Sequence, residues 1–127
     1  MSNIKFRYIV RHKASGNIET KHYFLSQIEE RPLKELSPAF LADYELLSRD
    51  QYTGLRDKNG VEVYEGDVLD CNGGIAVVFY SKRFVSYKLH FYSPFEQEQP
   101  FYFWDLEGFV IGNVYENPEL LEVSADD

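Results

Sequence analysis

Residues 51–68 read QYTGLRDKNGVEVYEGDV, and the fold class follows from this stretch. The pair Asn59-Gly60 is a hairpin-turn signal, because both residue types accept the positive φ angles that such turns require. A second turn is expected at Glu65-Gly66-Asp67. Short apolar segments between closely spaced glycine turns are typical of β structure, so the stretch predicts strands joined by tight turns.

The same pattern continues toward the C-terminus. Asn72-Gly73-Gly74 predicts a hairpin turn between strands at residues 68–71 and 75–80. After a turn at residues 81–83, apolar residues from Val85 to Phe91 alternate with polar ones, which indicates a half-buried strand. The other expected elements are a loop between Pro94 and Pro100, strands at residues 101–104 and 109–111, and a helical turn at residues 118–121.

The N-terminal part begins with an alternating strand. Its apolar face carries Ile4, Phe6, Tyr8 and Val10, and its polar face carries Lys5, Arg7 and Arg11. The turn signal at residues 15–17 and the β-forming residues 18–24 complete a hairpin. Ser26 and Ser37 have the spacing of helix caps, and Pro32 limits the first helix to about one turn. Residues 26–43 are therefore expected to be a helical excursion from a β scaffold.

These elements predict a mainly β protein, a β-rich α+β fold. Strands at such spacing with glycine turns indicate a small SH3-like or partly open β-barrel with an N-terminal hairpin and a short helical insertion. We expect one domain over residues 1–123, made of the hairpin (1–25), the helical insertion (26–48) and the barrel core (49–121). Residues 124–127 are expected to be an acidic tail.

Composition limits the class of protein. The chain has 127 residues, 44% apolar and 17% aromatic, which favours a globular domain rich in strands. Cys71 stands alone, which excludes an internal disulfide and a cysteine-rich zinc site. The first residues carry charges where a signal peptide would be apolar, and no apolar run approaches the ~20 residues of a membrane helix. We expect a soluble, cytoplasmic protein without membrane contact.

The charge is unevenly distributed. The net charge is -8, and residues 89–127 contain nine acids and no lysine or arginine. Residues 1–31 contain six bases and three acids. A basic front and an acidic back could attract each other within or between copies, but solvated surface charges explain the same numbers. The acidic balance argues against a broad, sequence-independent grip on phosphates.

The sequence shows no pattern that predicts a reaction. The three histidines share no metal-ligand spacing, and residues 57–60 lack the remaining features of a calcium loop. Cys71 is expected on a strand beside Asp70, where a nearby acid disfavours a reactive thiolate. The pairs Glu65/Asp67 and Asp105/Glu107 fit solvated turns better than acid–base catalysis. We expect no enzyme activity and no cofactor.

Three stretches resemble one known family. Residues 51–68 resemble the central motif of the YopX family of bacteriophage and prophage proteins, residues 110–121 resemble its closing motif, and residues 4–7 resemble its opening. After Arg7 the family often has Trp-Asp, where this chain has Tyr8-Ile9. Residues 26–48 and 93–104 match nothing in the family pattern. The resemblance implies a mainly β protein from a phage or integrated element, in a bacterial host cell, with no established activity.

We interpret the two longer motifs as a signature that specifies a fold. Its glycines suit turns or close backbone approach. Tyr52, Leu55, Tyr64, Val68, Ile111, Val114 and Tyr115 are expected to supply core. The signature residues are Gln51, Tyr52, Gly54, Leu55, Asp57, Asn59, Gly60, Tyr64, Glu65, Gly66, Asp67, Gly112, Asn113, Tyr115, Asn117 and Pro118.

The aromatic excess without chemistry predicts a protein that contacts other proteins, either a host partner or further copies of itself in a homo-oligomer. The expected contact surface is Tyr92, Phe95, Phe101, Tyr102 and Trp104. The alternative is a nucleic-acid-associated role. It would act by weak binding of single strands through Lys5, Arg7, Arg11, Lys82 and Arg83, or by acidic mimicry of DNA through Glu96, Glu98, Asp105 and Glu107.

Overall fold

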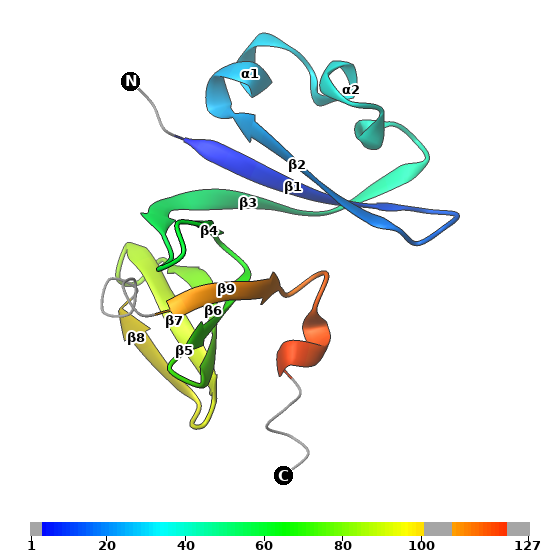
Figure 1. The fold of residues 1–127 in the computed structure, drawn as a ribbon. Helices are drawn as coiled ribbons and strands as arrows, with labels where there is room; N and C mark the ends of the chain where they lie inside the picture. Colours follow the sequence, from blue (N-terminus) through cyan, green and yellow to red (C-terminus); the bar gives the residue numbers. More distant parts are fainter. Residues whose placement is uncertain (1–3, 101–107, 122–127) are drawn as a thin grey trace. The chain divides into compact units, whose positions relative to one another are not determined.

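The computed structural model describes residues 4–100 and 108–121 (Figure 1). The chain divides into two compact units, Met1–Tyr52 and Thr53–Asp127. The strands form two antiparallel sheets, with orders β2-β1-β3-β4 and β8-β7-β6-β5-β9. No helix of the described residues has the length and apolar character needed to cross a membrane.

The first unit begins with the expected hairpin, formed by β1 (Lys5–His12) and β2 (Ile18–Phe24). Strand β3 (Tyr44–Arg56) pairs with the other side of β1 and continues into the second unit. Between β2 and β3 lie three short helical elements, α1 (Leu25–Glu30), α2 (Leu33–Leu36) and η1 (Pro38–Phe40). The hairpin and the helical insertion are thus confirmed, although residues 44–48, expected in the insertion, are strand.

The two expected helix caps have different outcomes. Ser37 does cap η1: its Oγ accepts a hydrogen bond from the backbone N–H of Ala39 at 3.1 Å, and Pro38 occupies the first position. The expected cap at Ser26 is wrong, because α1 begins one residue earlier, at Leu25. There the side-chain oxygen of Gln27 accepts from the backbone N–H of Phe24 at 2.8 Å.

Strand β1 departs from the expected alternation because it is buried on both faces at its centre. Tyr8, Ile9 and Val10 are all 2% exposed or less, and Arg7 is only 7% exposed. On one face the Tyr8 ring packs edge-on against Phe40 of η1, with the ring centroids 5.3 Å apart. The helical insertion therefore covers the face of the sheet that carries Tyr8. Arg7 is on the other face and is also buried, so the prediction that it lies on a solvated face is wrong.

The second unit contains the end of β3, β4 (Glu62–Tyr64), β5 (Asp67–Cys71), β6 (Gly74–Ser81), β7 (Ser86–Ser93), β8 (Gln97–Pro100), β9 (Gly108–Asn113) and η3 (Pro118–Leu121). Its core is apolar and comes mostly from inward-facing strand residues. The buried cluster is Val63, Leu69, Cys71, Ala76, Val78, Leu89 and Phe91, with Leu55, Tyr87 and Val110 packed against it.

The mainly β class is confirmed, and in the described residues the strands form two open sheets without a closed barrel. Three local expectations are wrong. The proline-bracketed loop contains β8, and Val85 lies in the turn before β7 with a φ of 52°. Tyr115, expected in the core, is 39% exposed. The strand expected at residues 101–104 lies outside the described residues.

Candidate functional site

The carboxylate of Asp57 is the centre of the turn at residues 57–60, and the residue is 7% exposed. Its Oδ1 accepts hydrogen bonds from the backbone N–H groups of Asn59 and Val61, both at 2.8 Å. Its Oδ2 accepts from the backbone N–H of Val110 in β9 at 2.9 Å. One carboxylate therefore satisfies three backbone donors, and it ties the turn to a strand 53 residues away in sequence.

This contact also protects a sheet edge. Among the strands of the described residues, β9 is the last of its sheet, so no described strand pairs with the backbone groups on its outer side. The turn takes that place: Val110 donates to Asp57, and the carbonyl of Gly108 accepts from the N–H of Lys58 at 3.2 Å. Covering an edge in this way satisfies its polar groups and blocks pairing with other chains.

The backbone of this turn differs from the predicted hairpin type. Gly60 has a φ of 82°, whereas Asn59 is not among the described residues with a positive φ. The N–H of Gly60 donates to the carbonyl of Asp57 at 3.0 Å, and the N–H of Asp57 donates to the carbonyl of Val61 at 2.8 Å. This φ favours glycine at position 60, and Asn59 contributes through its backbone N–H.

The second turn of the signature is held in the same manner. Asp67 is 1% exposed, and its Oδ2 accepts from the backbone N–H of Tyr64 at 2.8 Å. The N–H of Gly66 donates to the carbonyl of Val78 in β6 at 2.9 Å, and its carbonyl accepts from the N–H of Val114 at 3.0 Å. The turn at residues 65–67 is therefore fixed between β6 and the segment that follows β9.

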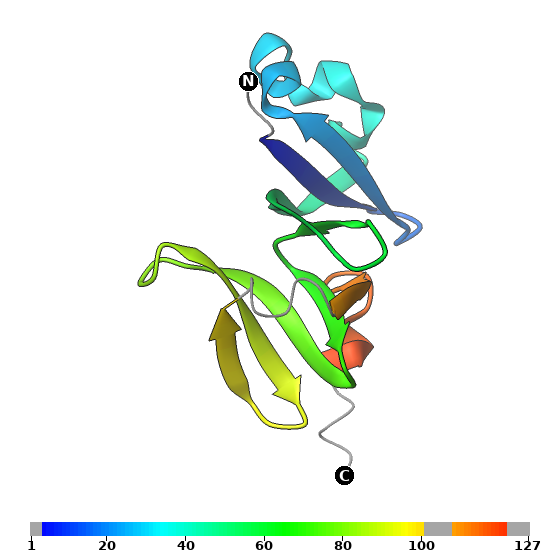
Figure 2. The same ribbon diagram turned by 60° about the vertical axis from the view of Figure 1, so that its left-hand side comes forward.

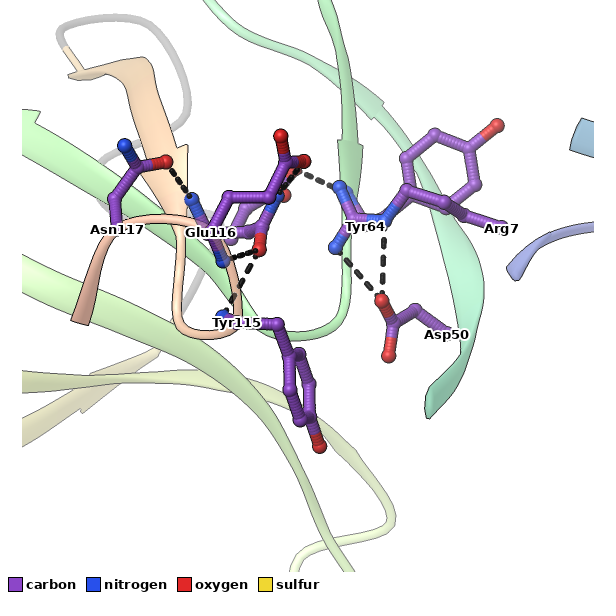
Figure 3. A network of polar contacts seen from close by, with 8 residues as sticks. Arg7, Asp50, Tyr64, Tyr115, Glu116 and Asn117 are labelled. Carbon is purple, nitrogen blue, oxygen red and sulfur yellow. Dashed lines mark hydrogen bonds and ion pairs between the residues drawn. The ribbon is translucent and has the colours of Figure 1, made fainter. Parts of the chain in front are cut away.

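The closing motif folds around Asn113. Its Oδ1 accepts from the N–H groups of Tyr115 at 3.0 Å and Glu116 at 2.9 Å, and its Nδ2 donates to the Glu116 carboxylate at 2.9 Å. The N–H of Asn113 in turn donates to Oδ1 of Asn117 at 3.2 Å. Figure 3 shows Tyr115, Glu116 and Asn117 in this tight turn. Its side-chain polar groups satisfy the backbone of their own segment.

Gly112 is required by this turn for space. A Cβ at position 112 would overlap the side chain of Asn117, whose Cγ lies 2.7 Å from the position that the Cβ would take. Gly112→Ala is therefore expected to displace Asn117 and lose its hydrogen bond to Asn113, lowering the free energy of unfolding by about 1–3 kcal/mol. Urea unfolding followed by circular dichroism measures this. An unchanged midpoint would contradict the close approach.

A different kind of surface lies where β6 turns into β7. Tyr80, Phe84 and Val85 are 41%, 57% and 73% exposed. The side chains of Lys82 and Arg83 are in the same turn, and Lys88 follows in β7. We call Tyr80, Lys82, Arg83, Phe84, Val85 and Lys88 the hairpin tip. In Figure 2 this tip projects from the sheet.

The aromatic rings of the hairpin tip are held by their neighbours. The Nζ of Lys88 lies 4.2 Å from the centroid of the Phe84 ring, and the guanidinium carbon of Arg83 lies 5.5 Å from it. Tyr80 packs edge-on against Tyr87, with the centroids 5.2 Å apart. The tip thus presents an ordered apolar surface beside positive charge, which is the composition of many protein-binding sites.

Comparison with known proteins places the chain in a family. The family model described as YopX protein matches residues 5–122, nearly the whole chain. The chain belongs to the YopX family. No curated protein matches it. A solved structure described as "Crystal structure of protein EF1440 from Enterococcus faecalis" shares 24% sequence identity, with a TM-score of 0.46, covering 91% of this chain and 75% of that one.

The remaining signature residues of this YopX protein lie in β3, β4, the turn after β4, and η3. Leu55 packs against the core, and Tyr64 is 3% exposed. The ammonium group of Lys5 lies 5.2 Å from the centroid of the Tyr52 ring. Gln51 pairs with Phe6 in the sheet, and Gly54 has a φ of 89°. Pro118 begins η3. The pKa of Tyr87 is raised mainly by burial, and the negative charge of Glu65 raises it further.

The expected contact surface is described only in part. Tyr92 and Phe95 are 36% and 73% exposed, whereas Phe101, Tyr102 and Trp104 lie outside the described residues. The hairpin tip adds three exposed apolar side chains, Tyr80, Phe84 and Val85, that the expected surface did not include. Sequence reasoning noted its basic residues and missed Val85, because alternation placed that residue in a strand. The signal lay in residues 81–83, a turn followed directly by two bulky apolar residues.

The basic and acidic residues of the nucleic-acid alternative are mostly paired. Arg7 donates to Asp50 at 2.8 Å and 3.0 Å, and Arg11 donates to Glu45 at 2.9 Å. Glu96 and Glu98 contact His90 and Lys88 respectively, whereas Asp105 and Glu107 lie outside the described residues. Over residues 4–100 and 108–121, no group of three or more His, Cys, Asp or Glu side chains is arranged to hold a metal ion.

Proposed function

We propose that this YopX protein is a non-enzymatic phage or prophage protein of the bacterial cytoplasm that acts by contacting another polypeptide through its hairpin tip. The buried polar side chains of the signature support the non-enzymatic part. Asp57 and Asn113 accept hydrogen bonds from backbone N–H groups, and Asp67 does the same for Tyr64. Groups used in this way hold turns in place and are not presented to a substrate.

The observation that carries the proposal is the conformation of Val85. A φ of 52° is a left-handed conformation, which costs an L-residue about 1–2 kcal/mol and is unusual for a β-branched side chain. Asparagine or glycine would fit this turn without that cost. The turn instead holds an apolar side chain that is 73% exposed, directly after the exposed ring of Phe84. Strain combined with apolar exposure is typical of a binding site.

Val85→Asn is expected to separate stability from binding. Asparagine accepts the left-handed conformation more easily than valine. The free energy of unfolding of the variant should therefore rise by about 1 kcal/mol, which raises Tm by about 4 °C. Partner binding should decrease, because the apolar contact is lost. Differential scanning calorimetry measures the first effect. A variant with unchanged or lower Tm would show that the valine conformation is not costly.

The proposal is tested by comparing two surfaces of the same protein. Bait protein, wild type or Phe84→Ser/Val85→Asn, is incubated with host extract, and the captured protein is identified by mass spectrometry and then purified. Phe95→Ser removes an exposed aromatic side chain, 73% exposed against 57% for Phe84, beyond the other end of β7 and serves as the control. Purified partner should bind wild type and Phe95→Ser and lose affinity for the tip variant. If Phe95→Ser lost affinity and the tip variant bound as wild type does, the binding site would lie at the loop that contains Phe95.

Nucleic-acid binding is a second candidate, because Lys82 and Arg83 flank an exposed ring on which a base could stack. The net charge of -8 opposes it, since phosphates would be repelled by most of the surface. Fluorescence anisotropy with a labelled single-stranded oligonucleotide, at low and physiological salt, tests this role. We expect no saturable binding at physiological salt. Saturable binding that Lys82→Glu/Arg83→Glu abolishes would favour the nucleic-acid role.

A further inference from the structure

We propose that the hairpin tip of one copy docks the acidic segment at residues 116–127 of a second copy. This inference rests on the proposed function and names its partner. It begins with charge. Residues 53–127 contain five lysines and arginines, and the tip holds three of them: Lys82, Arg83 and Lys88. Lys88 lies 3.5 Å from Glu98, whereas neither Lys82 nor Arg83 forms an ion pair within the described part of the chain.

The complementary surface is in the same sequence. Residues 116–127 contain five acids and no lysine or arginine, together with three large apolar residues. The acids are Glu116, which also accepts from Asn113, and Glu119, Glu122, Asp126 and Asp127; the large apolar residues are Leu120, Leu121 and Val123. Glu119 is exposed in η3 and forms no ion pair within the described residues. The segment thus offers carboxylates for Lys82 and Arg83 and apolar side chains for Phe84 and Val85.

The fold favours docking between copies over docking within one chain. The hairpin tip and η3 belong to the same unit, and in Figure 2 the tip projects away from the side where η3 lies. When the tip of one copy binds the acidic segment of a second copy, the contact is head-to-tail. The acidic segment of the first copy and the tip of the second copy then remain available for further copies. Such contacts extend into chains or close into rings. Because the ion pairs are at the surface, the association should weaken as salt rises.

Charge reversal tests the inference with the full chain. Sedimentation velocity over a wide concentration range should show self-association of wild type that decreases with added sodium chloride. Lys82→Glu/Arg83→Glu has an acidic tip and an unaltered acidic tail, and Asp126→Lys/Asp127→Lys has an unaltered basic tip and a tail that has lost most of its negative charge. Each variant alone should associate at least about tenfold more weakly than wild type. An equimolar mixture should associate again, because the unaltered basic tip of the tail variant then meets the unaltered acidic tail of the tip variant. Circular dichroism establishes that both variants are folded.

Several outcomes would overturn the inference. Wild type that stays monomeric excludes docking between copies, and charge-reversed variants that associate as wild type does place the contact elsewhere. If both charge-reversed variants are folded and their mixture does not associate, the pairing of tip and tail is excluded. If wild type is monomeric while Phe84→Ser/Val85→Asn loses binding to a purified host protein, the proposed function stands and only the second-copy partner is wrong. Saturable binding of a labelled oligonucleotide to the tip would replace the acidic segment with nucleic acid.

Discussion

Asp57→Ala is expected to lower the free energy of unfolding by about 4 kcal/mol, which is exceptional for a residue in a turn. The alanine leaves three backbone donors without their acceptor, and each hydrogen bond to a charged group contributes about 1.5–3 kcal/mol. It also uncovers the outer edge of β9, where the N–H of Val110 donates to this carboxylate. Urea unfolding followed by far-ultraviolet circular dichroism measures the change.

Two variants make this prediction specific. Asp70→Ala removes an acid that accepts from a single backbone N–H, that of Gly73, at an exposed turn, so about 1 kcal/mol should be lost. Asp57→Asn keeps one acceptor oxygen for the turn, but its amino group would face the N–H of Val110, and two donors cannot bond to each other. The free energy of unfolding of Asp57→Asn should therefore fall between those of wild type and Asp57→Ala. If Asp57→Ala were no more harmful than Asp70→Ala, the turn would not depend on this carboxylate.

Arg7→Met is expected to lower the free energy of unfolding by about 3–5 kcal/mol at neutral pH, because it leaves the Asp50 carboxylate buried without its guanidinium. Arg7 and Asp50 are 7% and 5% exposed, and Figure 3 shows both donor nitrogens directed at one carboxylate oxygen. Arg11→Met is the control. It removes an exposed pair with Glu45, so at most about 1 kcal/mol should be lost.

The cost of Arg7→Met should depend on pH in a definite direction. Burial raises the pKa of the Asp50 carboxyl, while hydrogen bonds and charge from Arg7 act to lower it. Without Arg7 the pKa rises further, so the folded protein retains a proton at pH values where the unfolded chain has lost it. The contribution of Asp50 to stability is then greatest in acid and is lost as pH rises through the raised pKa.

Unfolding of the variant at pH 5 and pH 8 measures this dependence, with wild type at each pH as the reference. The loss relative to wild type should be larger at pH 8. The double variant Arg7→Met/Asp50→Leu should recover much of the stability, because no buried charge remains. A loss of equal size at both pH values, without recovery in the double variant, would contradict the account of this pair.

Local features were predictable because their causes lie within a few residues. Asn72 and Gly73 have φ values of 55° and 89°, as their turn chemistry requires, and Ser37 caps η1 as its spacing indicates. Long-range features were not predictable. The partner of Arg7 is 43 residues away, so alternation placed a buried guanidinium on a solvated face. The sequence marked a turn at Asp57, but nothing near it indicated that Oδ2 reaches Val110.

The candidate site shows the same division. Because valine favours strands and follows a turn, the sequence pattern predicted that Val85 begins the strand β7. The structure gives it a left-handed turn conformation, where tertiary context overrides propensity. The sequence interpretation assigned the signature to turns and core; in the structure its side chains at Asp57, Asp67 and Asn113 also accept hydrogen bonds from backbone N–H groups. Their roles depend on which N–H groups the folded chain brings to them.

Amide hydrogen exchange in the wild-type protein, read by NMR, tests most directly whether the signature acids hold the fold. The N–H groups of Val61 and Val110 donate to Asp57, and that of Tyr64 donates to Asp67. Val110 is the most informative, since its N–H faces outward from an edge strand and has Asp57 as its acceptor. We predict that these three amides are protected nearly as well as the core of the second sheet. Exchange of Val61 and Val110 as fast as that of exposed turn amides would contradict it.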